Sequence, residues 1–148
     1  MPSSEASLVE QANARFYQAF ETLDLARMEA VWAHGEHVKC VHPGWPLLVG
    51  WDAVRSSWAT IFANTGEMRF TLSDVRASAS GDLAWVTCTE NIFSEVQGRL
   101  AVTSILATNL FERAADGWRL VHHHASHVFS AARSNRLVAR IDVTARRP

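Results

Sequence analysis

Three long β-strands joined by tight turns are predicted to occupy the second half of this 148-residue chain. Apolar and β-branched residues recur over 83–96, 99–112 and 118–128, each run being about twice the usual ~5–6 residues of a strand. A sheet of such strands twists strongly, so it curls and leaves a concave face that other elements must fill. Glycine-containing dipeptides mark the bends between the strands: Gly81-Asp82, Gln97-Gly98 and Asp116-Gly117.

The first half of the chain supplies three predicted amphipathic helices that can fill this face. The first opens at Ser7 with a capping-box pattern, although Ser3 or Ser4 could cap an earlier start. Asp24 is a good N-cap for the second helix, and the third follows Gly50. The stripe predicted to face the sheet from the first helix is Leu8, Ala12, Phe16, Ala19, Phe20 and Leu23.

A short strand over 38–42 and a further strand over 68–78 complete the predicted order of two helices, one strand, one helix and four strands. This order predicts an α+β fold, a cone-shaped, strongly curved and mostly antiparallel sheet wrapped around three N-terminal helices. The cone is predicted to span residues 1–129, and residues 130–148 a basic, partly ordered tail. The tail carries five Arg and one Asp, a formal charge of +4, so the remainder carries −5 of the total of −1. A weakly acidic body predicts no nucleic-acid partner.

The two cysteines of the chain predict a reducing compartment. Cys40 and Cys88 lie in predicted strands without metal-site or disulfide spacing, which is typical of buried thiols. The first residues lack the basic and apolar segments of a signal peptide, and no apolar run reaches membrane-spanning length. The sequence therefore predicts a cytoplasmic protein with no membrane partner. Six Trp in so short a chain indicate that some line a pocket or a partner surface.

Three consecutive histidines, His122 to His124, stand in the last predicted strand. Neighbours on a strand point to opposite faces, so His122 and His124 share one face and His123 lies on the other. A His-x-His pair can bind zinc but needs a third ligand, and His127 shares the face of His123 instead. The alternative that we favour places His122 and His124 on the outer sheet face, at a contact between subunits. Neither a metal nor another cofactor is predicted.

Three segments of the sequence carry a resemblance to known proteins: VHPG at 41–44, LVGWDAV at 48–54 and DGWRLVHHHAS at 116–126. They resemble the nuclear transport factor-like cone superfamily, closest to its SnoaL-like and ketosteroid-isomerase-related branch. The final strand is also similar to that of the association domain of calcium/calmodulin-dependent kinases. The resemblance spans roughly residues 5–128 and implies the cone fold. It leaves the activity open, because the superfamily holds isomerases, cyclases, hydrolases, dehydratases and non-catalytic assembly modules.

The resemblance to the kinase association domain implies which residues face the interior. Its inward-facing basic positions match Asn109 and Ala125, and less closely Thr87. Strand alternation then adds Thr89, Asn91, Ala107, Val121 and His123. Since no Arg occupies these positions, the implied site is a mixed polar and apolar pocket for a small, uncharged or weakly polar molecule. Together with the third helix and the loop before it, the predicted pocket comprises Trp45, Val54, Trp58, Thr87, Thr89, Asn91, Asn109 and Ala125.

His42 ends the short strand just before Pro43 and is the most pointed candidate for catalysis. In ketosteroid isomerase a similar turn before proline carries the Asp general base, so the resemblance implies that His42 occupies this place and keeps base chemistry available near neutral pH. The oxyanion Tyr of that enzyme matches Phe16, which cannot donate a hydrogen bond, and Tyr17 is rotated by roughly 100° on the helix. Steroid isomerisation is therefore not expected. A turn residue bonding nearby backbone is the alternative for His42, and His123 is a weaker candidate for the acid/base role.

Two functions of different classes follow from these residues. The first is a cofactor-free isomerase, dehydratase or hydrolase of a small molecule, with His42 or His123 as the acid/base. The second is a non-catalytic ligand-binding or dimeric assembly module. Glu90 is predicted to face outward, toward a partner subunit's histidine. The predicted homodimer patch on the outer sheet face comprises Val86, Cys88, Ile92, Leu106, Leu110, Leu120, His122 and His124.

Overall fold

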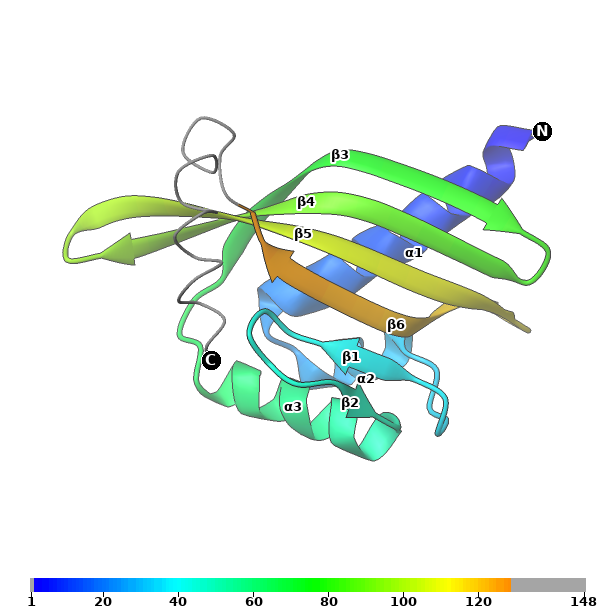
Figure 1. The fold of residues 1–148 in the computed structure, drawn as a ribbon, viewed down its shortest axis with the longest axis horizontal. Helices are drawn as coiled ribbons and strands as arrows, with labels where there is room; N and C mark the ends of the chain where they lie inside the picture. Colours follow the sequence, from blue (N-terminus) through cyan, green and yellow to red (C-terminus); the bar gives the residue numbers. More distant parts are fainter. Residues whose placement is uncertain (1, 129–148) are drawn as a thin grey trace, which may run out of the picture.

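A computed structural model describes residues 2–128 as three helices and one six-stranded sheet (Figure 1). The α+β cone fold predicted from the sequence is confirmed, and the structure adds the two-residue strand β2. The predicted tail, residues 130–148, lies outside the described residues. In chain order the elements are α1 (Pro2–Thr22), α2 (Leu25–Val31), β1 (Lys39–Val41), β2 (Leu48–Val49), α3 (Trp51–Ala63), β3 (Arg69–Ser80), β4 (Leu83–Val96), β5 (Arg99–Ala114) and β6 (Gly117–His127).

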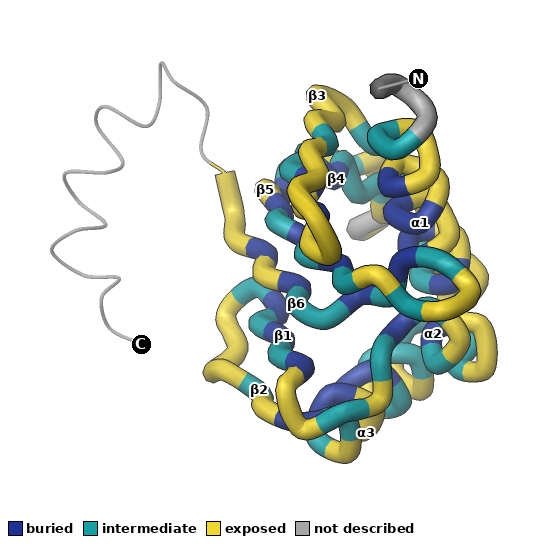
Figure 2. The backbone as a smooth tube through the Cα atoms, turned by 90° about the vertical axis from the view of Figure 1, so that its right-hand side faces the viewer, coloured by how far each residue is buried: buried dark blue, intermediate teal, exposed yellow. Residues whose placement is uncertain are grey.

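The sheet is open and mixed, with the strand order β2-β1-β6-β5-β4-β3. Every neighbouring pair is antiparallel except β1 and β6, which run parallel. The helix α1 lies across β3 to β6, and α3 lies beside β1 and β2 (Figure 1). Buried residues alternate with more exposed ones along β5 and β6, which indicates that one face of the sheet is covered, and α1 also carries buried residues (Figure 2). The concave face of the sheet therefore contains the core.

Local signals position α2 and α3 as predicted. The Asp24 side chain accepts a hydrogen bond from the Arg27 backbone N–H at 3.2 Å and caps α2. Gly50 precedes α3 with a φ of 91°, a conformation that favours glycine. The α1 helix begins at Pro2, earlier than the predicted Ser7.

The hairpin of β4 and β5 extends beyond the body of the sheet (Figure 1). Pairing of β3 with β4 reaches only Phe93, and pairing of β6 with β5 starts at Ile105. Residues 94–103 therefore form a two-stranded arm, and its tip residues Gln97 and Gly98 both have positive φ angles, 53° and 77°. Two successive positive φ values are typical of the two-residue hairpin turn whose twist matches that of the strands.

The face of α1 that packs on the sheet is broader than predicted. Leu8 is 50 % exposed, so its predicted place in the buried stripe is wrong, and Val9 is buried instead. The buried residues from α1 are Val9, Ala12, Asn13, Phe16, Tyr17 and Ala19.

The predicted facing of β4 is wrong by one residue. Val86 lies opposite Asn109, and residues directly opposite in an antiparallel pair share a face. The inner face of β4 therefore consists of Ala84, Val86, Cys88 and Glu90, which are all buried. Three residues predicted to line the pocket lie on the outer face instead: Thr87, Thr89 and Asn91.

A β-bulge reverses the alternation within β6. Leu110 lies opposite His122 but Phe111 lies opposite Leu120, so Val121 is an extra residue. As a result, Leu120 and His123 are both buried against the helices. Four residues of the predicted dimer patch therefore belong to the inner face, namely Val86, Cys88, Ile92 and Leu120, whereas Leu106, Leu110, His122 and His124 lie on the outer face.

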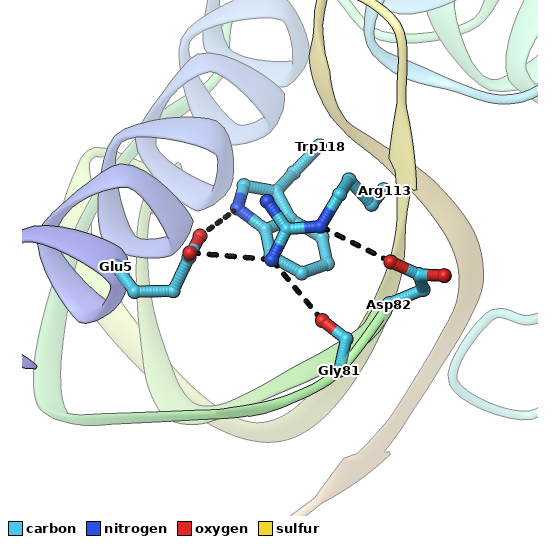
Figure 3. Close-up of polar contacts among 5 residues, drawn as sticks. All are labelled: Glu5, Gly81, Asp82, Arg113 and Trp118. Carbon is cyan, nitrogen blue, oxygen red and sulfur yellow. Dashed lines mark hydrogen bonds and ion pairs between the residues drawn. The ribbon is translucent and has the colours of Figure 1, made fainter.

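A polar cluster links the start of α1 to the end of the sheet opposite the arm. It consists of Glu5, Gly81, Asp82, Arg113 and Trp118 (Figure 3). Glu5 accepts hydrogen bonds from Trp118 Nε1 at 2.9 Å and from Arg113 Nη2 at 3.2 Å. The Arg113 guanidinium lies 4.4 Å over the Trp118 ring and also donates to Asp82 and to the Gly81 carbonyl. Three segments distant in sequence are thereby joined.

Replacing Glu5 by Ala is expected to lower the free energy of unfolding by about 1–2 kcal/mol, because the buried Trp118 N–H loses its acceptor. Urea unfolding measures the change. The matched control is Glu67→Ala, whose carboxylate pairs with the well-exposed Arg69 and should contribute no more than about 0.5 kcal/mol. Equal losses in the two variants would contradict the assigned role of Glu5.

Candidate functional site

His42 is held at the end of β1 by a hydrogen bond to α3. Its side chain is only 3 % exposed, and its Nε2 lies 2.9 Å from Ser57 Oγ. The Ser57 hydroxyl donates to the Val54 carbonyl at 2.7 Å, so it accepts from His42 and places the proton of the ring on Nε2. The lone pair then lies on Nδ1. Burial lowers the pKa of His42 to about 4, so the ring is neutral near pH 7.

Two tryptophans enclose the His42 ring. Trp58 of α3 packs nearly perpendicular to the His42 ring, with ring centroids 4.7 Å apart. Trp45, in the loop after β1, also packs edge-on against it, with centroids 4.9 Å apart. Trp58 is fully buried, whereas Trp45 is 38 % exposed and stands in the loop between Pro43 and Leu47. Trp45 therefore separates His42 from solvent.

His123 lies beside His42 in the interior. The two ring centroids are 6.2 Å apart, and His123 also contacts Phe16 and Trp58. Only 1 % of His123 is exposed, and burial, with a smaller contribution from His42, holds its pKa well below the usual range. Its Nδ1 lies 2.6 Å from Asn109 Oδ1.

A chain of buried hydrogen bonds continues from Asn109 to the opposite side of the core. Asn109 Nδ2 donates to Asn13 Oδ1 at 2.9 Å and to the Tyr17 hydroxyl at 3.1 Å. Tyr17 in turn donates to Glu90 Oε2 at 2.6 Å. Burial raises the pKa of Glu90 to about 7 and, with the Glu90 charge, raises that of Tyr17 well above its usual value.

The buried Glu90 carboxyl predicts a pH-dependent stability. Below about pH 4.5 it is protonated in both the folded and the unfolded chain, and as the pH rises to about 7 only the unfolded chain releases the proton. The free energy of unfolding should therefore fall over this range, by about 3 kcal/mol in the contribution of Glu90.

Glu90→Gln should remove this contribution, so the stability of the variant relative to the natural chain rises with pH by the same ~3 kcal/mol. The buried histidines, which favour the folded state at higher pH, are present in both proteins and cancel in the difference. Denaturant unfolding of both proteins from about pH 4.5 to 8 measures it. A difference that does not vary with pH would contradict the raised pKa of Glu90.

The structure brings together some of the predicted site residues and separates others. His42, His123, Trp58 and Asn109 form one cluster, with Trp45 at its edge. Val54 and Ala125 are buried in the same core, whereas Thr87, Thr89 and Asn91 face away from it.

Four polar residues of the core were missed or misplaced by the sequence prediction: Asn13, Tyr17, Ser57 and Glu90. Asn13 and Tyr17 are four residues apart, and both lie next to Ala12 and Phe16 of the predicted apolar stripe. Such a spacing on a helix is a usable indication of a shared buried face. Nothing comparable marks Ser57 or Glu90 in the sequence.

The indole N–H of Trp58 has no hydrogen-bond partner among the described residues, although it is buried, and the same holds for Trp32. A buried unpaired donor costs about 1–3 kcal/mol. Four hollows lined by described residues open to solvent, and His42, His123 and Trp58 line none of these four. Aromatic rings pack around the two histidines, with Trp45 and Trp58 against His42 and Phe16 and Trp58 against His123.

Two other kinds of feature can be assessed over the described part of the chain. Between residues 2 and 128, no three His, Cys, Asp or Glu side chains gather in an arrangement that could hold a metal ion. None of the helices in this range has both the length and the hydropathy to cross a bilayer.

Comparison with known proteins assigns these features to a family. The family model described as SnoaL-like domain matches residues 9–130. The chain is 40 % identical to a solved structure from Streptomyces avermitilis, a candidate dehydratase of the NTF2-like family, with a TM-score of 0.81 over 88 % of this chain and 100 % of that one.

Two further relatives differ in kind. A candidate calcium/calmodulin-dependent protein kinase type II association domain from Thiobacillus denitrificans is 38 % identical, with a TM-score of 0.74 over 81 % of this chain and 94 % of that one. The F-box protein SKIP8 of Arabidopsis thaliana is 32 % identical over 114 residues, which are 77 % of this chain and 47 % of that protein. The chain thus spans about half the length of this curated relative.

Proposed function

Since this chain belongs to the SnoaL-like domain family, as its sequence predicts, we propose that it is a cofactor-independent acid–base enzyme that dehydrates a small β-hydroxy carbonyl compound. The observation that carries the proposal is the pair of neutral, buried rings of His42 and His123, with centroids 6.2 Å apart. Neutral histidines in a dry interior can take and return a proton. The likeness to a candidate dehydratase favours dehydration over isomerisation or hydrolysis.

The reaction needs one proton to be moved and one C–O bond to break. The lone pair of His42 Nδ1 takes the proton from the carbon next to the carbonyl, and a C=C bond forms as the β-hydroxyl leaves. The proton is returned to that hydroxyl, so water departs and His42 is neutral again. The buried Trp58 N–H, which has no partner among the described residues, is the donor that we assign to the carbonyl oxygen, on which negative charge develops.

Entry of the substrate requires Trp45 to move. This side chain covers His42, is partly exposed, and stands in a loop with Gly44 at a φ of 83°. Loop residues that cover a site are well suited to admit a ligand and then exclude water. Displacement of Trp45 would open the side of the His42 ring that Trp45 covers to a small, weakly polar molecule.

The proposal is tested with a panel of small β-hydroxy ketones and thioesters in D₂O, followed by NMR. We expect the unsaturated product to form, and we expect a His42→Gln/His123→Gln double variant to form none. No product over the whole panel, or equal rates in the double variant, would overturn the proposal. A folded double variant is verified by its circular dichroism and unfolding midpoint.

A second candidate function, assembly of identical subunits, is favoured by the outer sheet face. Trp85 is 37 % exposed there and lies opposite Leu110, which in turn pairs with His122. Leu106, on the same face of β5, is 48 % exposed. The likeness to a candidate kinase association domain supports assembly as a function. The free thiols of Cys40 and Cys88 fit a reducing, cytoplasmic location for either function.

Leu106→Glu is expected to convert a dimer to a monomer, because a charge would enter the centre of the apolar contact. Sedimentation equilibrium measures the mass. The matched control is Leu8→Glu, an equally exposed leucine on α1, which should leave the mass unchanged. A natural chain that is monomeric at micromolar concentrations would count against assembly.

A further inference from the structure

We propose that Glu90, Tyr17 and Asn109 are positioning residues that fix the ring proton of His123 on Nδ1 and leave Nε2 as the basic atom. The inference deepens the proposed function, and its relevance to catalysis rests on that function. The structural part of it, the tautomer of His123, is independent of any substrate. It follows from the donors and acceptors of four side chains taken in order.

The order begins at Glu90, which is ionised above about pH 7 and can then only accept hydrogen bonds. Glu90 Oε2 lies 2.6 Å from the Tyr17 hydroxyl, so Tyr17 must donate its single proton there. Both groups are buried, with 3 % and 4 % exposed, and Glu90 is the only side-chain acceptor of the Tyr17 hydroxyl among the described residues. The direction of the first hydrogen bond is thereby set.

The second step sets the orientation of the Asn109 amide. Having given its proton to Glu90, the Tyr17 oxygen can only accept, and the amide atom 3.1 Å away must be the nitrogen of Asn109. The same nitrogen donates its second proton to Asn13 Oδ1, 2.9 Å away. Cys88 Sγ, 3.6 Å from the Tyr17 oxygen, is a weak donor and is compatible with this order. The amide is therefore held with its oxygen toward His123.

The third step assigns the proton of His123. Asn109 Oδ1 lies 2.6 Å from His123 Nδ1, and an amide oxygen only accepts, so Nδ1 carries the hydrogen. No side chain among the described residues bonds Nε2, which keeps its lone pair. Reversing this order would require the carboxylate to donate, so the tautomer of His123 is set by a group three hydrogen bonds away.

The tautomer is measured directly by NMR of the protein labelled with ¹⁵N at its seven histidines. The protonated and the bare ring nitrogens have well-separated shifts, and the His123 signals are those lost in a His123→Gln variant. Near pH 8, where Glu90 is ionised, we expect a single neutral tautomer with the proton on Nδ1. A proton on Nε2, or averaged shifts for both nitrogens, would overturn the inference in the natural protein alone.

Variants then test which residues set the tautomer. Tyr17→Phe removes the link between Glu90 and Asn109, and Glu90→Gln allows the order to reverse, so the Nε2–H form should increase by about tenfold in each. The control is Cys88→Ala, which alters a contact with the same Tyr17 oxygen but not the direction of its proton. An unchanged His123 tautomer in a folded Tyr17→Phe or Glu90→Gln protein would remove these residues from the positioning role.

These outcomes are distinguishable from failure of the proposed function. If His123 is protonated on Nδ1 and the variants shift it while no carbonyl compound reacts, the positioning is correct and the dehydratase proposal is wrong. If compounds react but His123 carries its proton on Nε2, the dehydratase proposal is correct and the positioning of His123 is wrong.

Discussion

Replacing His42 by Gln is expected to lower kcat/KM for dehydration by about 10²–10⁴-fold, the usual contribution of a positioned general base. Glutamine keeps a donor for Ser57 but has no basic nitrogen, so the variant retains the hydrogen bond that holds β1 to α3. The rate is measured under initial-velocity conditions with the best substrate of the panel. Because the ring of His42 is already neutral at pH 7, the rate of the natural protein should not rise between about pH 6 and 8 through its titration.

The matched control is His37→Gln. His37 follows α2, is half exposed and pairs with Glu112 at the surface, so its replacement should leave the rate within about twofold. A rate in the His42 variant equal to that of the control would exclude His42 from the reaction. A loss of rate together with a large loss of stability would instead indicate a structural contribution, which urea unfolding of both variants identifies.

Replacing Trp58 by Ala is expected to lower the free energy of unfolding by about 3–5 kcal/mol. The side chain is fully buried and its ring contacts Phe16, Phe20 and Phe62 as well as both histidines. Removing it leaves a cavity that the surrounding aromatic rings can fill only in part. Urea unfolding followed by circular dichroism measures the loss.

Trp45→Ala is the matched comparison, because Trp45 contacts the same histidine but is 38 % exposed. Its loss should cost no more than about 1–2 kcal/mol, since part of its surface is in water in both states. If Trp58→Ala cost as little as Trp45→Ala, the interior around His42 would be loosely packed. A substrate could then reach His42 without movement of Trp45.

Much of this fold could be predicted because its signals are local. The cap at Asp24, the glycine before α3 and the three long strands are each specified by neighbouring residues, and the structure confirms them. The strand β2 has only two residues and shows no alternation, so the sequence did not predict it. Two residues are too few for a period to be recognised.

The facing of the strands could not be predicted with the same success, because it depends on pairing between distant segments. A shift of one residue in β4 moved Thr87 outward and Glu90 inward, as a register slip always does. The bulge at Val121 has no recognisable sequence pattern, and it changes which residues of β6 share a face. Glu90 was predicted to face outward because it shares the strand alternation of Cys88 and Ile92, which were assigned to the outer face. Carboxylates are seldom buried, and Tyr17, distant in the sequence, supplies the hydrogen bond that Glu90 accepts inside the core.

The projecting arm of β4 and β5 implies that backbone amides of the same hairpin exchange with deuterium at very different rates. Between residues 94 and 103 each strand has a single neighbour, so about half of the amide N–H groups face water. Those groups should exchange for deuterium almost as fast as in a free peptide, whereas the amides around Asn109, covered by strands on both sides, should exchange only when the sheet opens. One continuous hairpin thus contains both fast-exchanging amides in the arm and some of the slowest-exchanging amides of the sheet.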